Sequence, residues 1–94
     1  MYDPPHPGEF IREVYFDTLE LSARSVALKL KVSPSTFARV LNGKSGITPE
    51  MALRLSKTLG RSAESWLAMQ SNYDLWQARQ RVDLTDVEEL QLVA

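Results

Sequence analysis

The 94-residue sequence contains no cysteine, only one histidine and no long run of apolar residues. Without cysteine the chain has no disulfide, no thiolate zinc site, no iron–sulfur cluster and no cysteine nucleophile. The one histidine, His6, lies in a proline-rich segment, and we expect it to be a surface residue or to mark the start of the first helix. Neither a histidine-based triad nor a glycine-rich phosphate loop is present, so we expect no catalytic residues, no metal site, no cofactor and hence no enzyme.

The distribution of apolar residues also argues against a membrane partner. No apolar stretch approaches the roughly 18 residues needed to span a bilayer. The first residues lack the basic region and following apolar stretch of a secretory signal. A chain of this length forms about one domain with a modest core. We therefore expect a cytoplasmic, single-domain protein.

Acidic and basic residues are separated along the chain, although the formal net charge is only −1. Residues 1–20 carry one base against five acids, residues 21–61 eight bases against one acid, and residues 62–94 two bases against six acids. Partners respond to local potential rather than to average charge. The middle block therefore predicts one electropositive face, which permits a nucleic-acid partner.

Apolar residues recur at helical spacing through most of the chain, and no strand pattern of useful length precedes residue 82. A Ser or Thr suited to N-capping precedes each of the last four predicted helices, at Ser22, Ser33, Thr48 and Ser62. Helices are predicted at about residues 8–18, 23–31, 34–42, 49–59 and 63–79. The fold class is all-α, with a domain at residues 1–80 and a C-terminal tail at 81–94. The tail is a short helix after Thr85 or an arm that pairs with a partner, and periodicity does not decide between them.

Two short predicted helices separated by a three-residue turn at residues 22–42 have the geometry of a helix-turn-helix, whose second helix enters the DNA major groove. Ala27 is small where the two helices must approach closely, while Phe37 and Val40 supply apolar contacts between them. The opposite face of the second helix is polar and contains no acid, so it can approach phosphates without repulsion.

Groove chemistry assigns roles to the polar residues of this segment. We expect the residues that read base edges to be Ser35, Thr36 and Arg39, because the start of a recognition helix reaches the bases and arginine pairs with guanine O6 and N7. Six further residues lie at helix starts or in the loop after the second helix, where phosphates are usually bound. These predicted phosphate contacts are Ser22, Arg24, Ser33, Asn42, Gly43 and Lys44.

One position departs from the usual motif. The turn residue Lys31 stands where such motifs often have glycine, because the turn needs a left-handed backbone that costs other residues about 1 kcal/mol. We also expect Arg54, Lys57 and Arg61 to form a solvated stripe, with a toxin or phosphate contact as the alternative.

The last predicted helix carries more large apolar residues than one helix face of a 94-residue chain can bury. Trp66 and Leu67 are the best candidates for the core. The remainder would be exposed unless a partner covered them, so we expect a homodimer interface that contains Trp76, Leu84, Val87 and Leu90.

From His6 to Arg79 the chain resembles the HigA/VapI group of phage-repressor-like helix-turn-helix proteins, the antitoxins of HigBA toxin–antitoxin pairs. The matching segments are His6-Pro7-Gly8-Glu9, Leu41-Asn42-Gly43-Lys44, Ile47-Thr48-Pro49-Glu50-Met51-Ala52-Leu53-Arg54-Leu55, Ser65-Trp66-Leu67-Ala68-Met69-Gln70 and Tyr73-Asp74-Leu75. The resemblance implies a five-helix, lambda-repressor-like fold and a homodimer that binds a palindromic operator in double-stranded DNA. It also implies repression of the chain's own operon and binding of a RelE-like toxin that cleaves mRNA.

Two other interpretations stay open at this point. The chain could be a stand-alone regulator with the same fold and no toxin. Alternatively, it could be a protein-only inhibitor or adaptor that does not bind DNA, with its function in the last helix and tail. The acidic flanks suggest attraction of a basic ribonuclease, but do not say which flank is involved.

Overall fold

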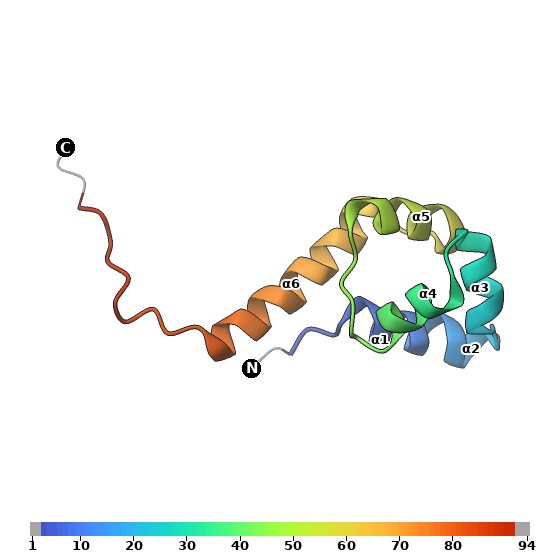
Figure 1. Cartoon of the computed structure of the whole chain (residues 1–94), viewed down its shortest axis with the longest axis horizontal. Coiled ribbons are helices and arrows are strands. Elements are labelled where there is room, and N and C mark those ends of the chain that lie inside the picture. The colour runs from blue at the N-terminus through green and yellow to red at the C-terminus, as the bar shows by residue number, and fades with distance from the viewer. Residues whose placement is uncertain (1–2, 92–94) are drawn as a thin grey trace.

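The computed structural model describes residues 3–91, in which all regular structure is helical. The elements, in chain order, are α1 (Pro7–Ile11), the π-helical η1 (Arg12–Phe16), α2 (Asp17–Leu19), α3 (Ala23–Leu30), α4 (Pro34–Leu41), α5 (Pro49–Leu59) and α6 (Ala63–Arg81). The first three follow one another without a break, so the architecture is five helices, as predicted. Helices α1 to α5 surround a core, and α6 extends away from it (Figure 1).

The first helix contains a wide turn that the sequence did not reveal. The backbone N–H of Asp17 donates to the carbonyl of Arg12, five residues back, as in a π-helix. The additional residue in this turn lets Tyr15 and Phe16, neighbours in sequence, both pack against the core. The helix ends at Glu20, whose φ of 54° is left-handed.

The four predicted N-caps are confirmed. The hydroxyls of Ser22, Ser33, Thr48 and Ser62 each accept a hydrogen bond from the backbone N–H three residues later, at 3.0, 3.1, 3.2 and 3.0 Å. Pro34 and Pro49 occupy first helical positions, where no intrahelical donor is needed. The starts of α3 to α6 are therefore fixed locally, by the residues that the sequence shows.

The core is formed by buried residues of α1, α3, α4, α5 and α6 and by Ile47 in the loop between α4 and α5. It contains Ile11, Val26, Ala27, Leu30, Phe37, Val40, Leu41, Ile47, Met51, Ala52, Leu55 and Trp66. Trp66 is fully buried, as predicted, and its Nε1–H donates to the carbonyl of Gly60 at 2.9 Å. Leu67 is only partly buried and lies at the edge of this core.

His6 is buried at the start of the first helix, so of the two alternatives expected for it the surface position is wrong and the position at the helix start is confirmed. Its Nδ1 accepts a hydrogen bond from the N–H of Gly8 at 2.9 Å, so His6 is the N-cap of α1. Its ring packs edge-on against Tyr73 of α6, with 5.0 Å between ring centroids. Burial lowers the pKa of His6 and favours the neutral ring, the form that can accept this bond.

Gly8 is the point of closest approach between α1 and α4. A Cβ built at Gly8 would lie 1.9 Å from the carbonyl oxygen of Val40 and 2.9 Å from the Cα of Leu41. These are backbone atoms, so rotation of a side chain could not relieve the clash. Only glycine allows α4 to lie this close to α1.

The tail leaves the body at the end of α6. Residues 82–91 form no helix or strand and are exposed throughout, and they continue away from the core (Figure 1). Residues 1, 2 and 92–94, which belong to the predicted domain and tail, lie outside the described residues. In the part of the chain that the structure describes, no helix is long and apolar enough to cross a membrane.

We expect Gly8→Ala to destabilise the fold by about 3 kcal/mol, because α4 must move away from α1 to admit the methyl group. Urea unfolding followed by circular dichroism measures the change. Glu9→Ala, at the next and exposed position of the same helix, is the control and should change the unfolding free energy by less than about 0.5 kcal/mol. Equal stabilities of the two variants would contradict the close approach.

We expect Lys31→Gly to stabilise the fold by about 0.5–1 kcal/mol. Lys31 has φ 62° and ψ 40°, and glycine removes the cost of this left-handed backbone but gains some entropy in the unfolded chain. Lys29→Gly, inside α3, should instead destabilise by about 1 kcal/mol. A Lys31→Gly protein less stable than the wild type in the same urea titration would refute this explanation.

Candidate nucleic-acid interface

Helices α3 and α4 form the predicted helix-turn-helix. Ala27 of α3 is fully buried and lets α4 approach, while Phe37 and Val40 of α4 are buried in the core. In the turn, the N–H of Val32 donates to the carbonyl of Ala27 at 3.1 Å. The inward face of α4 is therefore locked, and its other face points away from the core.

An arginine from α5 braces the turn. Nη1 of Arg54 donates to the carbonyl of Leu30 at 2.8 Å and lies 3.4 Å from that of Lys31, so it satisfies the C-terminal end of α3. The guanidinium of Arg61 lies over the ring of Phe10, 5.0 Å from its centroid. The predicted solvated position is therefore wrong for Arg54, which is half-buried, whereas Lys57 and Arg61 are both exposed, as predicted.

The three predicted base-reading residues lie together on the exposed face of α4. Ser35, Thr36 and Arg39 are all exposed, and the first two belong to the first turn of the helix. Arg39 follows one turn later on the same side. The placement satisfies the geometry expected of a recognition helix, while their contacts with bases stay a prediction.

The hydroxyls of the two predicted phosphate-binding serines already have partners. Ser22 Oγ accepts from the N–H of Ser25, which leaves its hydroxyl hydrogen for an outside group. Ser33 Oγ accepts from the N–H of Thr36 and also donates to Thr36 Oγ1 at 2.8 Å. A phosphate bound by the Ser33 hydroxyl would have to displace this internal bond. Arg24, beside Ser22, is exposed on α3.

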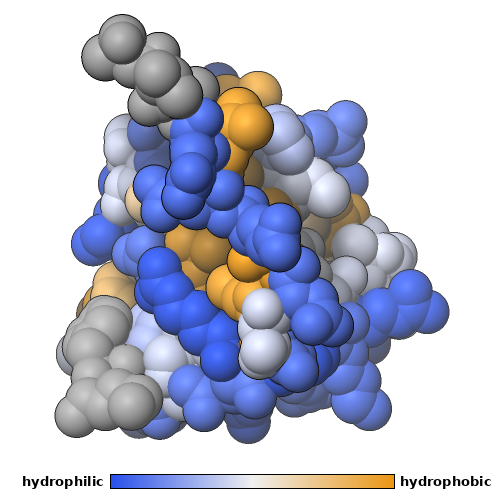
Figure 2. Space-filling view, turned by 90° about the vertical axis from the view of Figure 1, so that its left-hand side faces the viewer, coloured by the Kyte–Doolittle hydropathy of each residue, from blue (hydrophilic) through white to orange (hydrophobic). Residues whose placement is uncertain are grey.

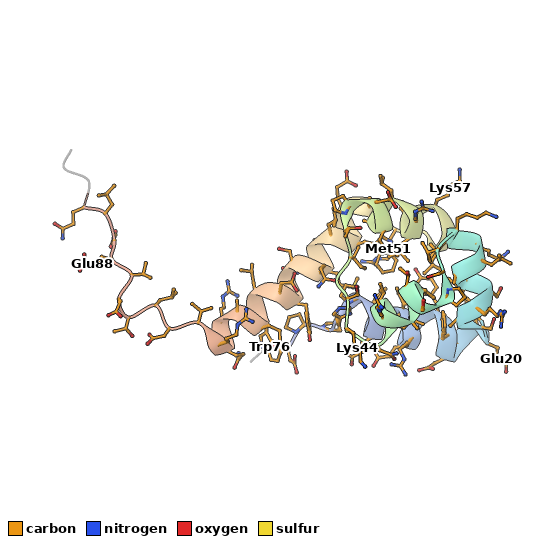
Figure 3. All side chains as sticks on the ribbon, viewed as in Figure 1. Glu20, Lys44, Met51, Lys57, Trp76 and Glu88 are labelled. Carbon is orange, nitrogen blue, oxygen red and sulfur yellow. The ribbon has the colours of Figure 1, made fainter. Side chains whose placement is uncertain are left out.

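The loop after α4 can contact a phosphate through its side chains, but few of its backbone N–H groups are free to donate. The N–H groups of Asn42, Gly43 and Lys44 donate to the carbonyls of Ala38, Val40 and Arg39, at 2.9, 3.1 and 2.9 Å. Gly43 has a φ of 73°, so the helix ends in a left-handed residue, which glycine adopts without strain. Any contact of this loop with phosphate would therefore come from the side chains of Asn42 and Lys44. The exposed side chain of Lys44 is labelled in Figure 3.

Sequence reasoning missed Arg12, which supports the same loop. Its Nη1 lies 3.5 Å from the carbonyl of Leu41 and from Oδ1 of Asn42, thirty residues away in sequence. Arg12 thus holds Asn42 at the end of α4 and lines a cavity of about 320 Å³ together with His6 and Gly43. The only sequence signal was that Arg12 is the single base among the first 20 residues.

The basic residues of this surface are not neutralised by neighbouring acids. Among residues 3–91 the one ion pair joins Glu50 and Arg54, at 3.4 Å. Arg24, Arg39 and Lys44 therefore make no ion pair with the described chain. Their charges are available to an outside anion.

The four predicted dimer residues lie at the other end of the molecule. Trp76 is half-buried on α6 beside Tyr73, with 6.4 Å between ring centroids. Leu84, Val87 and Leu90 are exposed on the tail. Their place in a dimer interface stays a prediction.

Comparison with known proteins gives the same fold. The helix-turn-helix family profile matches residues 17–66, which include α2, α3, α4, α5 and the start of α6. The uncharacterized HTH-type transcriptional regulator YddM of Escherichia coli strain K12 is 39% identical over 90 residues, which cover 96% of this chain and 95% of that protein.

Solved structures extend the likeness to antitoxins. The antitoxin GraA in complex with its operator has a TM-score of 0.82 and 36% identity, covering 100% of this chain and 95% of that one. The Pseudomonas aeruginosa antitoxin HigA with the higBA promoter has a TM-score of 0.82 and 32% identity, covering 95% and 99%. The chain therefore belongs to the helix-turn-helix family and, within it, to the HigA-type antitoxins.

Proposed function

We propose that this antitoxin binds the operator of its own operon as a homodimer, represses that operon, and also binds an mRNA-cleaving toxin. The observation that carries the DNA-binding part is the outward face of α4, which is polar, exposed and free of acidic residues. The basic residues near it make no ion pair within the described residues. The two antitoxin structures that resemble the chain are described as complexes with an operator and a promoter.

The proposed mode of binding places α4 in the major groove. Arg39 would donate its two parallel N–H groups to O6 and N7 of a guanine, while Ser35 and Thr36 would contact bases nearer the start of the helix. Arg24, in the first turn of α3, and Lys44, in the loop after α4, are both exposed and would bind phosphates. Asn42, held by Arg12, would fix the register of the loop on the backbone.

A homodimer would read a palindrome with two copies of α4. Such helices must lie about one DNA turn apart, roughly 34 Å, so that both enter the groove on the same side of the duplex. Trp76 and the tail residues Leu84, Val87 and Leu90 supply apolar surface for the dimer, at the end of the molecule away from α4. We infer that the protein acts by binding rather than catalysis, in the cytoplasm where its operator lies.

The toxin partner would be a RelE-like ribonuclease, a class whose basic surface suits an acidic docking site. Glu9, Glu13 and Asp17 recur every four residues along α1, η1 and α2 and are all exposed. Exposed acids also occupy the tail, at Glu88 and Glu89. Electrostatic attraction of this kind would raise the association rate more than it strengthens the final complex.

We expect Arg39→Ala to lose about 1–3 kcal/mol of binding free energy on the operator and clearly less on random DNA. Arg24→Ala should instead weaken binding to both DNAs similarly and reduce the dependence of log Kd on log salt by about one unit. Fluorescence anisotropy at two salt concentrations measures both effects. If the wild-type protein showed no salt-sensitive binding to its own upstream DNA, the proposal of a repressor would be refuted. The interpretation as a protein-only inhibitor would then remain.

We expect the product of the adjacent reading frame to bind this antitoxin and to stop cleaving mRNA in its presence. Glu13→Gln with Asp17→Asn should slow association at low salt, and the difference should shrink at high salt. The matched pair Glu88→Gln with Glu89→Gln tests the other acidic segment, and Glu64→Gln is the control. Association rates unchanged in both pairs would exclude electrostatic attraction by either segment.

A further inference from the structure

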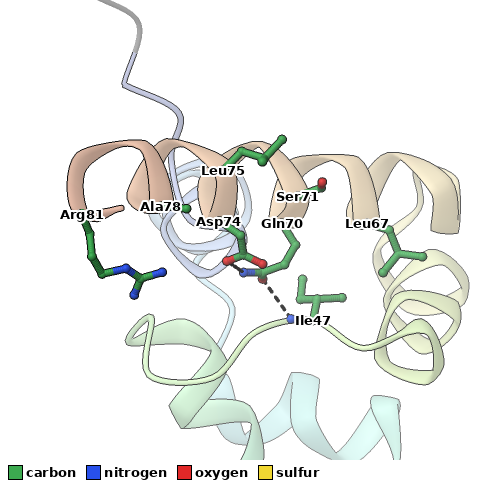
Figure 4. A pocket seen from close by; sticks show the side chains of 8 residues that line it. All are labelled: Ile47, Leu67, Gln70, Ser71, Asp74, Leu75, Ala78 and Arg81. Atoms are coloured by element: carbon green, nitrogen blue, oxygen red, sulfur yellow. Dashed lines mark hydrogen bonds between the residues drawn. The ribbon is translucent and has the colours of Figure 1, made fainter. Parts of the chain in front are cut away.

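Two hydrogen-bonded networks of side chains lie near the surface, and only one of them has capacity left for a ligand. The first lines an open groove of about 540 Å³ along α6, with Ile47 in its wall (Figure 4). There Gln70 Oε1 accepts from the N–H of Ile47 and Gln70 Nε2 donates to Asp74 Oδ1, each at 2.9 Å, so the amide is engaged within the chain. From the end at which α6 projects, apolar surface is seen between hydrophilic side chains (Figure 2). The second network, at the start of α4, is open to the outside.

Three hydroxyl groups meet at the start of α4, on the face that we propose to enter the major groove. Ser33 Oγ accepts from the backbone N–H of Thr36 at 3.1 Å and donates to Thr36 Oγ1 at 2.8 Å. Ser33 Oγ also lies 3.3 Å from Ser35 Oγ, within hydrogen-bond distance. All three residues are exposed, so the bonding capacity that remains to their hydroxyls is available to an outside group.

The number of hydrogens decides the direction of these bonds. A serine hydroxyl has one hydrogen to donate and two lone pairs that accept. Ser33 uses its hydrogen for Thr36, at the shorter of the two hydroxyl distances, and one lone pair for the cap. Its contact with Ser35 then uses the second lone pair, so Ser35 is the donor in that contact. The hydroxyl of Ser33 is thereby saturated.

The two outer hydroxyls are left with different capacities. Ser35 has given its hydrogen to Ser33, and only its lone pairs remain. Thr36 has accepted from Ser33 and keeps its hydrogen and one lone pair. Toward an outside group Ser35 is therefore an acceptor only, whereas Thr36 is able to donate.

Base edges in the major groove distinguish between these two capacities. The donors there are the amino groups of adenine and cytosine, while guanine O6, purine N7 and thymine O4 are acceptors. An acceptor-only hydroxyl forms a hydrogen bond with the amino groups alone. An acceptor atom placed against it would leave two acceptors unpaired once water is excluded, which costs affinity.

We propose that Ser33 determines the specificity of the recognition helix, because it restricts Ser35 to the amino group of adenine or cytosine and leaves Thr36 as the donor toward an acceptor atom. The inference rests on the operator binding of the proposed function and names the base groups that α4 reads. Ser33 is a positioning residue in this arrangement. Its hydroxyl serves the two reading residues instead of a phosphate, so no internal hydrogen bond has to be displaced.

Duplexes with single base-pair replacements locate the contact of Ser35. Each base pair of one half-site, taken from the DNA upstream of the chain's own reading frame, is replaced in turn. Fluorescence anisotropy measures the affinity of the wild type and of Ser35→Ala for every duplex. The replacement that weakens binding of the wild type but not of Ser35→Ala marks the contacted pair. If no base pair depends on Ser35, the proposal is overturned.

Base analogues at the contacted pair then separate donors from acceptors. A duplex whose adenine or cytosine lacks the amino group should bind the wild type about 10-fold more weakly and should bind Ser35→Ala as well as the unmodified duplex does. A 7-deazapurine, which lacks the N7 acceptor, should leave the contribution of Ser35 unchanged. The opposite pattern, a contribution of Ser35 that is lost with N7 and kept without the amino group, would contradict an acceptor-only hydroxyl.

Two variants change the network without changing Ser35. Thr36→Val removes the acceptor of the Ser33 hydrogen, which then becomes available to Ser35, and Ser33→Ala removes the acceptor of the Ser35 hydrogen. In both variants Ser35 regains a hydrogen for the DNA. The loss of affinity on the amino-free duplex should therefore shrink from about 10-fold to less than about 3-fold. Ser33→Thr, which retains the hydroxyl, should restore the full discrimination.

Ser62→Ala is the matched control for the helix cap that Ser33→Ala also removes. Ser62 caps α6 through the same kind of bond, 3.0 Å from the N–H of Ser65, and does not belong to the hydroxyl network. Both substitutions should lower the stability of the fold in urea. Only Ser33→Ala should reduce the discrimination between the unmodified and the amino-free duplex. If Ser33→Ala and Thr36→Val both discriminate as strongly as the wild type, the network does not set the bonding direction and the proposal is refuted.

These outcomes are separable from a failure of the proposed function. If the wild type does not bind its upstream DNA at all, repression and this inference are refuted together. If the wild type binds and Arg39→Ala weakens that binding, but no amino group matters to Ser35, operator binding stands and the inference alone is refuted.

Discussion

Burial of one face of α4 is the constraint on which the candidate interface depends. Phe37 is fully buried and its ring lies 6.2 Å from that of Phe16, while Val40 follows it into the same core. With these two side chains fixed, the helix cannot rotate, and the polar residues between them must face outward. The close approach at Gly8 then fixes the distance between α1 and α4. The outward face is thus positioned by the packing of the inward face, since the hydrogen bonds of Ser33 with Ser35 and Thr36 join only neighbours at the start of the same helix.

Contacts between distant parts of the chain support the C-terminal end of each of the two helices of the helix-turn-helix. Arg54 satisfies the carbonyls at the end of α3, and Arg12 does the same at the end of α4. Positive side chains are favoured at helix C-termini, where unpaired carbonyls concentrate negative charge. Two of the basic residues, the exposed Arg12 and the half-buried Arg54, therefore support helix ends as well as carrying charge.

Features that depend on neighbours in sequence could be predicted, and features that depend on distant residues could not. The caps at Ser22, Ser33 and Ser62 involve donors three residues away, so the helix starts follow from the sequence directly. The same holds for the outward position of Arg39, which follows from helical periodicity. By contrast, the support of Asn42 by Arg12 spans thirty residues, and the packing of His6 against Tyr73 joins the first helix to the last. The groove along α6 was also invisible, because its wall at Ile47 comes from another part of the chain.

The length of α6 has a consequence for operator architecture. Its 19 residues carry the chain from the core, where Trp66 is anchored, to the proposed contact with the second copy. Inserting one residue beyond the core would turn everything after it by about 100° and advance it by about 1.5 Å. In the proposed dimer such a change alters the phase and distance between the two recognition helices, and hence the spacing of half-sites that they can read together. In the proposed dimer the length of α6 therefore sets the half-site spacing. Antitoxins whose projecting helices differ in length should bind operators whose half-sites are spaced differently.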